Sequence, residues 1–225
     1  MTSKPGMYVL PFPDRQAAGR MLAERLADAV DLSDWTERTV VVGLPRGGVA
    51  VAKEVATVLG LPMEVIVTRK IGYPPQPELG VGAIAEGLRQ PVFDVRLFDR
   101  LGLVPEDLTE VVAAEEAELD RRVRTYRGGS PLPKVAGWCV IVVDDGLATG
   151  GTARAALRSL RAAQAAYLVL AVPVAPWSAV ESLRAEADQV VVLVAPSRFS
   201  SVGEWYLAFG QLTDADVLAL LGQSR

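Results

Sequence analysis

The chain has 225 residues, half of them hydrophobic and 22% charged, with a formal net charge of −4. A chain of this length can bury roughly 70% of its unfolded surface and form a core without disulfides or metals, and its negative charge gives no general attraction to nucleic acid or anionic membranes. Histidine is absent and Cys139 is the only cysteine, which excludes Ser-His-Asp and Cys-His nucleophile pairs, His-liganded zinc and internal disulfides.

The N-terminal part alternates helical and strand patterns. Asp14 is expected to cap a helix over 15–30, in which apolar residues recur at helical spacing. The run TVVVG at 39–43 predicts a strand buried on both faces, followed by a helix over 49–59 and a second buried strand over 63–68.

Residues 72–87 contain four glycines and three prolines, too many for a regular element, and predict either a long loop or a bent hairpin arm. Within them, Gly80–Ala85 fits the dinucleotide pattern G-x-G-x-x-A. It follows a proline-rich stretch rather than a strand and opens no helix, so we do not interpret it as a nucleotide site.

The second half continues the alternation. Helices are predicted over 105–126, 150–163, 178–187 and 214–221, and strands over 138–143, 167–174 and 189–194. Alternating helices and continuously apolar strands indicate an α/β fold with a mostly parallel sheet flanked by helices. Ligands of such folds bind beyond the carboxyl ends of the strands, which here are 43–48, 68–70 and 144–152.

The segment VIVVDDGLATGGTA at 140–153 is the most informative. Its glycine-rich turn, opening a helix, exposes backbone N–H groups that suit a phosphate. The preceding Asp144 and Asp145 would repel phosphate but suit sugar hydroxyls or a hydrated divalent cation. The segment therefore indicates a phosphorylated sugar, and the alternative is an Asx turn with a helix cap. It lacks the lysine of a Walker A loop.

This segment resembles the signature of the type I phosphoribosyltransferases, which bind 5-phosphoribosyl-1-pyrophosphate (PRPP). The resemblance implies a five-stranded parallel core, a small hood and Mg²⁺-dependent phosphoribosyl transfer with release of pyrophosphate. Asp144 and Asp145 would then bind the ribose hydroxyls and the Mg²⁺. The 5-phosphate would lie on the loop that follows, made of Ala148, Thr149, Gly150, Gly151 and Thr152.

Other segments agree with this resemblance in order. Arg46 and Gly47 would meet the pyrophosphate, although a plain turn before a helix also explains them. Arg69 and Lys70 would be catalytic at the base of a mobile loop over 71–87, the alternative being a surface hairpin.

The tail after Ala195 resembles the family only loosely. It gathers four aromatic residues within eleven positions: Phe199, Trp205, Tyr206 and Phe209. Such rings, Phe199 and Trp205 among them, would stack the acceptor base, or simply pack the last helix on the sheet.

The expected organisation is one domain, with a core over about 38–195, a hood over 196–225 and the helix over 14–30. The expected partners are PRPP and a small heterocyclic acceptor, with no nucleic acid and no membrane. No secretory leader is visible, and the longest apolar stretch, 168–177, is too short to cross a bilayer. We therefore expect a cytoplasmic protein, and a homo-oligomer.

The sequence departs from the purine-specific pattern of the family. Ala148 stands where those members carry an acid, and no lysine follows the strand over 167–174. We therefore expect weak or no activity on hypoxanthine and guanine, and only Glu86 and Glu204 as candidate bases. Two functions stay open: transfer to a nucleobase or another nitrogen heterocycle, and non-catalytic sensing of PRPP or a nucleotide. A PRPP-making or sugar-phosphate kinase would need an ATP site, and none is evident.

Overall fold

A computed structural model describes residues 11–35 and 37–222. Its body is a five-stranded sheet in the order β2-β1-β6-β7-β8, in which all neighbours are parallel. The α/β fold predicted from the sequence is therefore confirmed. The strands are β1 (Thr39–Gly43), β2 (Met63–Val65), β6 (Cys139–Val143), β7 (Tyr167–Val174) and β8 (Gln189–Val194).

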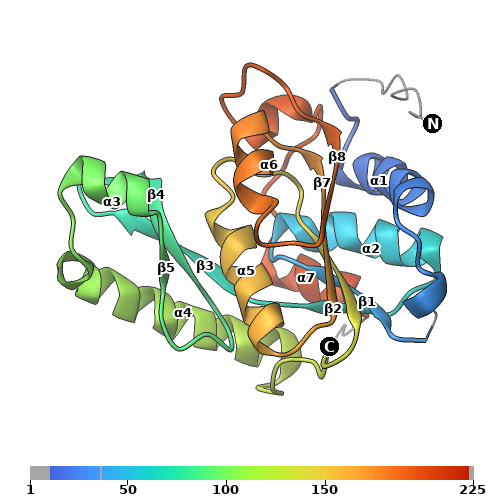
Figure 1. The fold of residues 1–225 in the computed structure, drawn as a ribbon, viewed down its shortest axis with the longest axis horizontal. Coiled ribbons are helices and arrows are strands. Elements are labelled where there is room, and N and C mark those ends of the chain that lie inside the picture. Colours follow the sequence, from blue (N-terminus) through green and yellow to red (C-terminus); the bar gives the residue numbers. More distant parts are fainter. Residues whose placement is uncertain (1–10, 36, 223–225) are drawn as a thin grey trace.

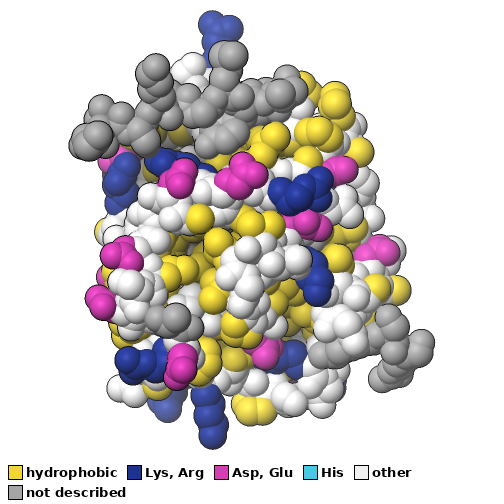
Figure 2. Space-filling model, turned by 90° about the vertical axis from the view of Figure 1, so that its right-hand side faces the viewer, with side chains coloured by type: hydrophobic (Ala, Val, Ile, Leu, Met, Phe, Trp, Pro, Cys, Tyr) yellow, Lys and Arg dark blue, Asp and Glu magenta, His cyan; other side chains and the backbone are white. Residues whose placement is uncertain are grey.

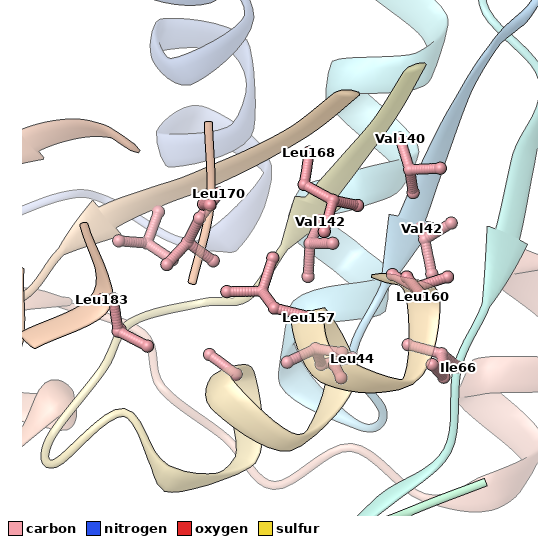
Figure 3. Packing of buried hydrophobic residues seen from close by; sticks show 14 of the residues in the cluster. Val42, Leu44, Ile66, Val140, Val142, Leu157, Leu160, Leu168, Leu170 and Leu183 are labelled. Atoms are coloured by element: carbon pink, nitrogen blue, oxygen red, sulfur yellow. The ribbon is translucent and has the colours of Figure 1, made fainter. Parts of the chain in front are cut away.

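Helices cover both faces of this sheet, and Figure 1 shows it nearly edge-on between them. One face packs on α1 (Arg15–Ala29) and α2 (Gly47–Leu59), the other on α5 (Gly151–Ala162) and α6 (Trp177–Leu183). Figure 3 shows Leu157 of α5 packed near Val142 and Leu170 of the sheet. Because alternate strand residues serve opposite faces, both must be apolar, which explains the continuous apolar runs.

Residues 68–127 form a second unit that extends from the body as an arm (Figure 1, left). Its antiparallel sheet has the order β3-β4-β5, with β3 (Thr68–Tyr73), β4 (Gln76–Ala85) and β5 (Val92–Phe93). The helices are α3 (Val95–Leu101), the 3₁₀ turn Pro105–Leu108 and α4 (Thr109–Arg127). The helix predicted over 105–126 thus begins as a 3₁₀ turn, and α3 and β5 were not predicted.

Of the two structures predicted for residues 72–87, the bent hairpin is the one observed, and the long irregular loop is wrong. The ordering of this segment over bound PRPP stays a prediction. Ile71, Val81 and Ile84 are buried against the helices of the arm and hold the strands in place. A register shift between Ile71 and Gly72 accommodates the glycines, since a Cβ atom on Gly72 would lie 2.5 Å from the Pro77 carbonyl oxygen. The dinucleotide-like pattern lies inside β4.

The segment over 202–222 returns to the body, where its residues 205–208 lie beside Phe12 and Pro13. Phe12 pairs with Tyr206, and the Leu207 N–H donates to the Phe12 carbonyl oxygen at 2.8 Å. The 3₁₀ turn Val202–Trp205 precedes this pairing, and α7 (Asp214–Leu220) follows it and contacts α2 and α4. The helix predicted over 178–187 ends earlier, at Leu183.

Charges of both signs are interspersed on the face shown in Figure 2. In the part of the chain that the structure describes, no helix combines the length and the apolar character needed to cross a membrane.

Candidate functional site

Two neighbouring carboxylates stand directly after β6. The Asp145 N–H donates to Oδ1 of Asp144 at 2.9 Å, and the Asp145 side chain is 14% exposed. Burial, and then the charge of Asp145, raise the pKa of Asp144 well above its ordinary value. Burial also raises the pKa of Asp145, but the Arg15 guanidinium opposes that rise. A pair of acids held in this way favours a cation or a hydroxyl donor beside it.

The loop after the acids leads into α5 with its backbone N–H groups available. Gly150 precedes the helix with φ of 78°, in the left-handed region that favours glycine. Within residues 11–35 and 37–222, no side chain caps the helix start. Ala148 and Thr149 are exposed, whereas Thr152 is partly buried. Gly146–Thr152 lines a cavity of about 140 Å³ together with residues of the arm. Helix amides that lack a protein partner suit a phosphate.

A second glycine loop, between β1 and α2, lies against the same acids. A Cβ atom on Gly47 would lie 1.9 Å from Oδ2 of Asp145, and one on Gly48 would lie 2.8 Å from the Asp144 Cα. The Pro45–Arg46 peptide bond is cis. The structure therefore places Gly47 beside the acid pair, and its role toward pyrophosphate stays a prediction. The Arg46 guanidinium instead lies 3.9 Å from the Asp214 carboxylate at the start of α7.

Arg69 and Lys70 lie on opposite faces of β3, so the structure does not bring them together. The Arg69 Nε donates to Glu115 of α4 at 2.6 Å. The Lys70 ammonium donates to the Glu78 carbonyl oxygen at 3.1 Å and lines the cavity of the 148–152 loop. Lys70 thus faces the predicted phosphate loop, and Arg69 faces the helix of the arm.

The aromatic residues near the C-terminus pack at the carboxyl end of the sheet. Phe199 and Trp205 are partly buried in a cluster with Phe12, Tyr206 and Phe209. The Tyr206 hydroxyl donates to the Asp145 backbone carbonyl, so this cluster touches the acid pair. The Trp205 indole Nε1 is buried without a hydrogen-bond partner in the described part of the chain. Both the packing interpretation and the base-stacking interpretation remain compatible with this position.

Glu86 is not available as a general base. Its carboxylate is buried, forms an ion pair with Arg127 and accepts the Val67 N–H at 2.7 Å. Glu204, in contrast, is exposed on the 3₁₀ turn before Tyr206.

Arg15 and Tyr206 are neighbours of the acid pair that the sequence analysis did not identify. Arg15 is the first residue of α1, and its Nε donates to Oδ2 of Asp145 at 2.7 Å. No local signal marks it, because an arginine in the first turn of an amphipathic helix normally lies in solvent. Tyr206 directly follows Trp205, and the contact of its hydroxyl with the Asp145 carbonyl oxygen was not predicted.

Comparison with known proteins gives consistent results. The family model described as phosphoribosyl transferase domain matches residues 14–197. Proteins of two Mycobacterium tuberculosis strains, both provisionally named as phosphoribosyl transferases, are 44% identical over 215 residues. These residues are 95% of this chain but 47% of the relatives, so the chain spans about half the length of the curated relatives it matches.

Solved structures show the same fold. The crystal structure of TT1426 from Thermus thermophilus has a TM-score of 0.75 and 42% identity, covering 93% of this chain and 97% of that one. The AQ2163 protein of Aquifex aeolicus, with a TM-score of 0.50 and 16% identity over 84% of this chain and 78% of that one, resembles it in fold alone.

Proposed function

The chain belongs to the phosphoribosyl transferase domain family, and from this premise we propose that it transfers the 5-phosphoribosyl group of PRPP to a small nitrogen heterocycle. The bond between the sugar C1 and a pyrophosphate oxygen breaks, and a bond between C1 and a ring nitrogen forms. Pyrophosphate and the proton of that nitrogen are released. The observation that carries the proposal is that Gly47 and Gly48 lie against Asp144 and Asp145, the two acids from which the glycine loop before α5 continues, at one sheet edge.

In this proposal each loop receives one end of the donor. The 148–152 loop takes the 5-phosphate on its unpaired amides, with Lys70 across the cavity. Asp144 and Asp145 accept hydrogen bonds from the ribose hydroxyls, as charged acceptors do strongly. The loop at Arg46 and Gly47 takes the pyrophosphate, for which Arg46 must turn from Asp214 toward the diphosphate. Arg69 acts indirectly, by fastening β3 to α4.

The acid pair also fits a divalent cation. Two adjacent, partly buried carboxylates provide oxygen ligands, and among the described residues Arg15 is the cation paired with them. Among the described residues, no group of three or more acids and cysteines could hold a metal by itself. Mg²⁺ commonly takes one or two carboxylates together with substrate phosphates, which agrees with this arrangement. When bound, it would neutralise charge on the pyrophosphate.

Calorimetry with PRPP and Mg²⁺ tests the donor assignment. Asp145→Asn removes a charged hydrogen-bond acceptor from the ribose, and we expect a loss of about 1.5–3 kcal/mol of binding free energy. Asp28→Asn, on the exposed side of α1, is the matched control and should leave the affinity unchanged. Unchanged affinity in the Asp145 variant would contradict the assignment.

Sensing of PRPP without catalysis is the other outcome. Tight PRPP binding without pyrophosphate release for any acceptor would favour it. No binding of PRPP to the wild-type protein would contradict both functions.

A further inference from the structure

Arg15 joins three segments that are far apart in the sequence. Its Nε donates to Oδ2 of Asp145, with the two side chains 11% and 14% exposed. A terminal guanidinium nitrogen donates to the Gly210 carbonyl oxygen at 2.8 Å, and the guanidinium carbon lies 3.9 Å from the centre of the Phe209 ring. The first turn of α1, the acid pair and the 206–210 segment therefore meet at one side chain.

This arrangement differs from an ordinary surface ion pair. Arg20, further along the same helix, pairs with Glu54 at 3.2 Å and is 54% exposed, so its geometry is weakly fixed. The Arg15 guanidinium is instead held by a carboxylate, a carbonyl oxygen and an aromatic face. A lysine has no planar group and cannot form all three contacts at once.

The contacts of Arg15 also fix the orientation of Asp145. Oδ2 of Asp145 lies between Arg15 and the Cα of Gly47. The space is so narrow that a Cβ atom on residue 47 would overlap with Oδ2. The Asp145 backbone carbonyl accepts the Tyr206 hydroxyl. The 206–210 segment therefore holds Asp145 in two ways. Tyr206 contacts the Asp145 backbone directly, and Arg15 links the Asp145 side chain to Gly210.

We propose that Arg15 is a positioning residue for the phosphoribosyl donor. It orients the Asp145 carboxylate toward the sugar and couples that carboxylate to the 206–210 segment beside it. Asp145, which receives the ribose, then behaves as one unit with the 206–210 segment, which covers the end of the sheet. This inference rests on the proposed function, because it assigns the ribose to Asp145.

A double-mutant cycle separates this role from a general contribution to folding. Arg15→Gln, Asp145→Asn and the double variant are compared by PRPP calorimetry in Mg²⁺. Arg15→Gln should weaken PRPP binding about tenfold or more, Arg15→Lys should weaken it less, and Arg20→Gln should leave it unchanged. In the Asp145→Asn background, Arg15→Gln should change the affinity by no more than about twofold. Losses that add, or unchanged affinity in Arg15→Gln, would overturn the inference.

A measurement on the ligand-free protein keeps the test independent of PRPP. The Leu207 and Ala208 amides donate to the Phe12 and Pro13 carbonyl oxygens, and Arg15 holds the segment that contains them. Their hydrogen exchange should become faster in Arg15→Gln but not in Arg20→Gln. If wild-type protein binds no PRPP, the proposed function fails. Unchanged exchange in Arg15→Gln would overturn the coupling itself, whatever the donor. If Arg15→Gln does not fold, Arg15→Lys serves in both measurements.

Discussion

Gly47 and Asp145 are in direct contact, although Gly47 begins α2 after β1 and Asp145 follows β6. A Cβ atom on Gly47 would lie 1.9 Å from Oδ2 and 2.5 Å from Cγ of Asp145. β1 and β6 are adjacent and parallel, so the loops at their carboxyl ends meet. The site therefore requires glycine at 47 for close approach, and the backbone of one loop limits where the acid of the other can lie.

The first prediction follows from this contact. Gly47→Ala should displace the Asp145 carboxylate and weaken PRPP binding about as much as Asp145→Asn, because a methyl group cannot share that space. Calorimetry of PRPP binding measures the effect. Asp28→Asn, on the exposed side of α1 and outside the site, is the control. Equal affinity in Gly47→Ala and wild-type protein would show that residue 47 and Asp145 lie further apart than in this structure.

A second prediction concerns the cost of keeping Asp144 beside Asp145. The pKa of Asp144 is raised, so ionisation of this group destabilises the folded protein at neutral pH. Asp144→Asn should therefore raise the Tm by a few degrees in the absence of Mg²⁺, at roughly 2–4 °C for each kcal/mol. The same variant should lose PRPP affinity, since it no longer offers a charged acceptor.

The pH dependence of this stabilisation follows from the direction of the shift. A carboxyl group with a raised folded-state pKa is neutral in both states below its ordinary pKa, about 3.9. The stability difference between Asp144→Asn and wild-type protein should therefore shrink as the pH falls through the folded pKa, and vanish below the ordinary value. Chemical denaturation at several pH values checks this. A variant less stable than wild type at neutral pH would contradict the predicted cost.

A third prediction concerns Glu86, which the sequence offered as a possible base. Glu86→Ala would leave the Arg127 guanidinium buried without its partner, and we expect a loss of about 3–5 kcal/mol of stability. Urea denaturation measures this loss. Glu78→Ala is the control, because Glu78 is 96% exposed and its pair with Lys70 contributes little. A Glu86→Ala protein of unchanged stability but without activity would instead indicate a base.

The sequence predicted the central strands because their environment leaves little choice. A strand covered on both faces must be apolar at every position, so TVVVG at 39–43 and CVIVV at 139–143 could be recognised without tertiary information. The glycine loop after β6 could be recognised because its chemistry is local. The strand over 76–85 could be given only as one of two alternatives, since its first three residues are exposed, its last five are buried, and glycines interrupt it.

Contacts between distant segments explain what the sequence analysis missed at the site. Lys70 and Arg69 were expected to act together, but a strand places successive side chains on opposite faces, and only the observed hairpin shows that β3 continues through them. The pairs of Arg46 with Asp214 and of Arg15 with Asp145 each join residues whose separation in space depends on the whole fold.

The last prediction concerns the acceptor. The acid that lines the cavity of the 148–152 loop in the described chain is Asp94, whose carboxylate caps α3 by accepting the Leu97 N–H at 3.1 Å. Ala148 occupies the position of the acid found in purine-specific members, Glu86 pairs with Arg127, and histidine is absent. A general base typically contributes 10²–10⁴-fold to a rate, so purines that must lose a proton should react slowly. We therefore expect little pyrophosphate release with hypoxanthine or guanine, and more with heterocycles that bind already deprotonated.

The measurement is pyrophosphate release with PRPP, Mg²⁺ and a panel of purines, pyrimidines and other nitrogen heterocycles. The control is Glu204→Gln, which removes the remaining exposed candidate. Loss of release in that variant would identify Glu204 as the base, whereas rapid turnover of hypoxanthine or guanine by wild-type protein would contradict the argument from Ala148.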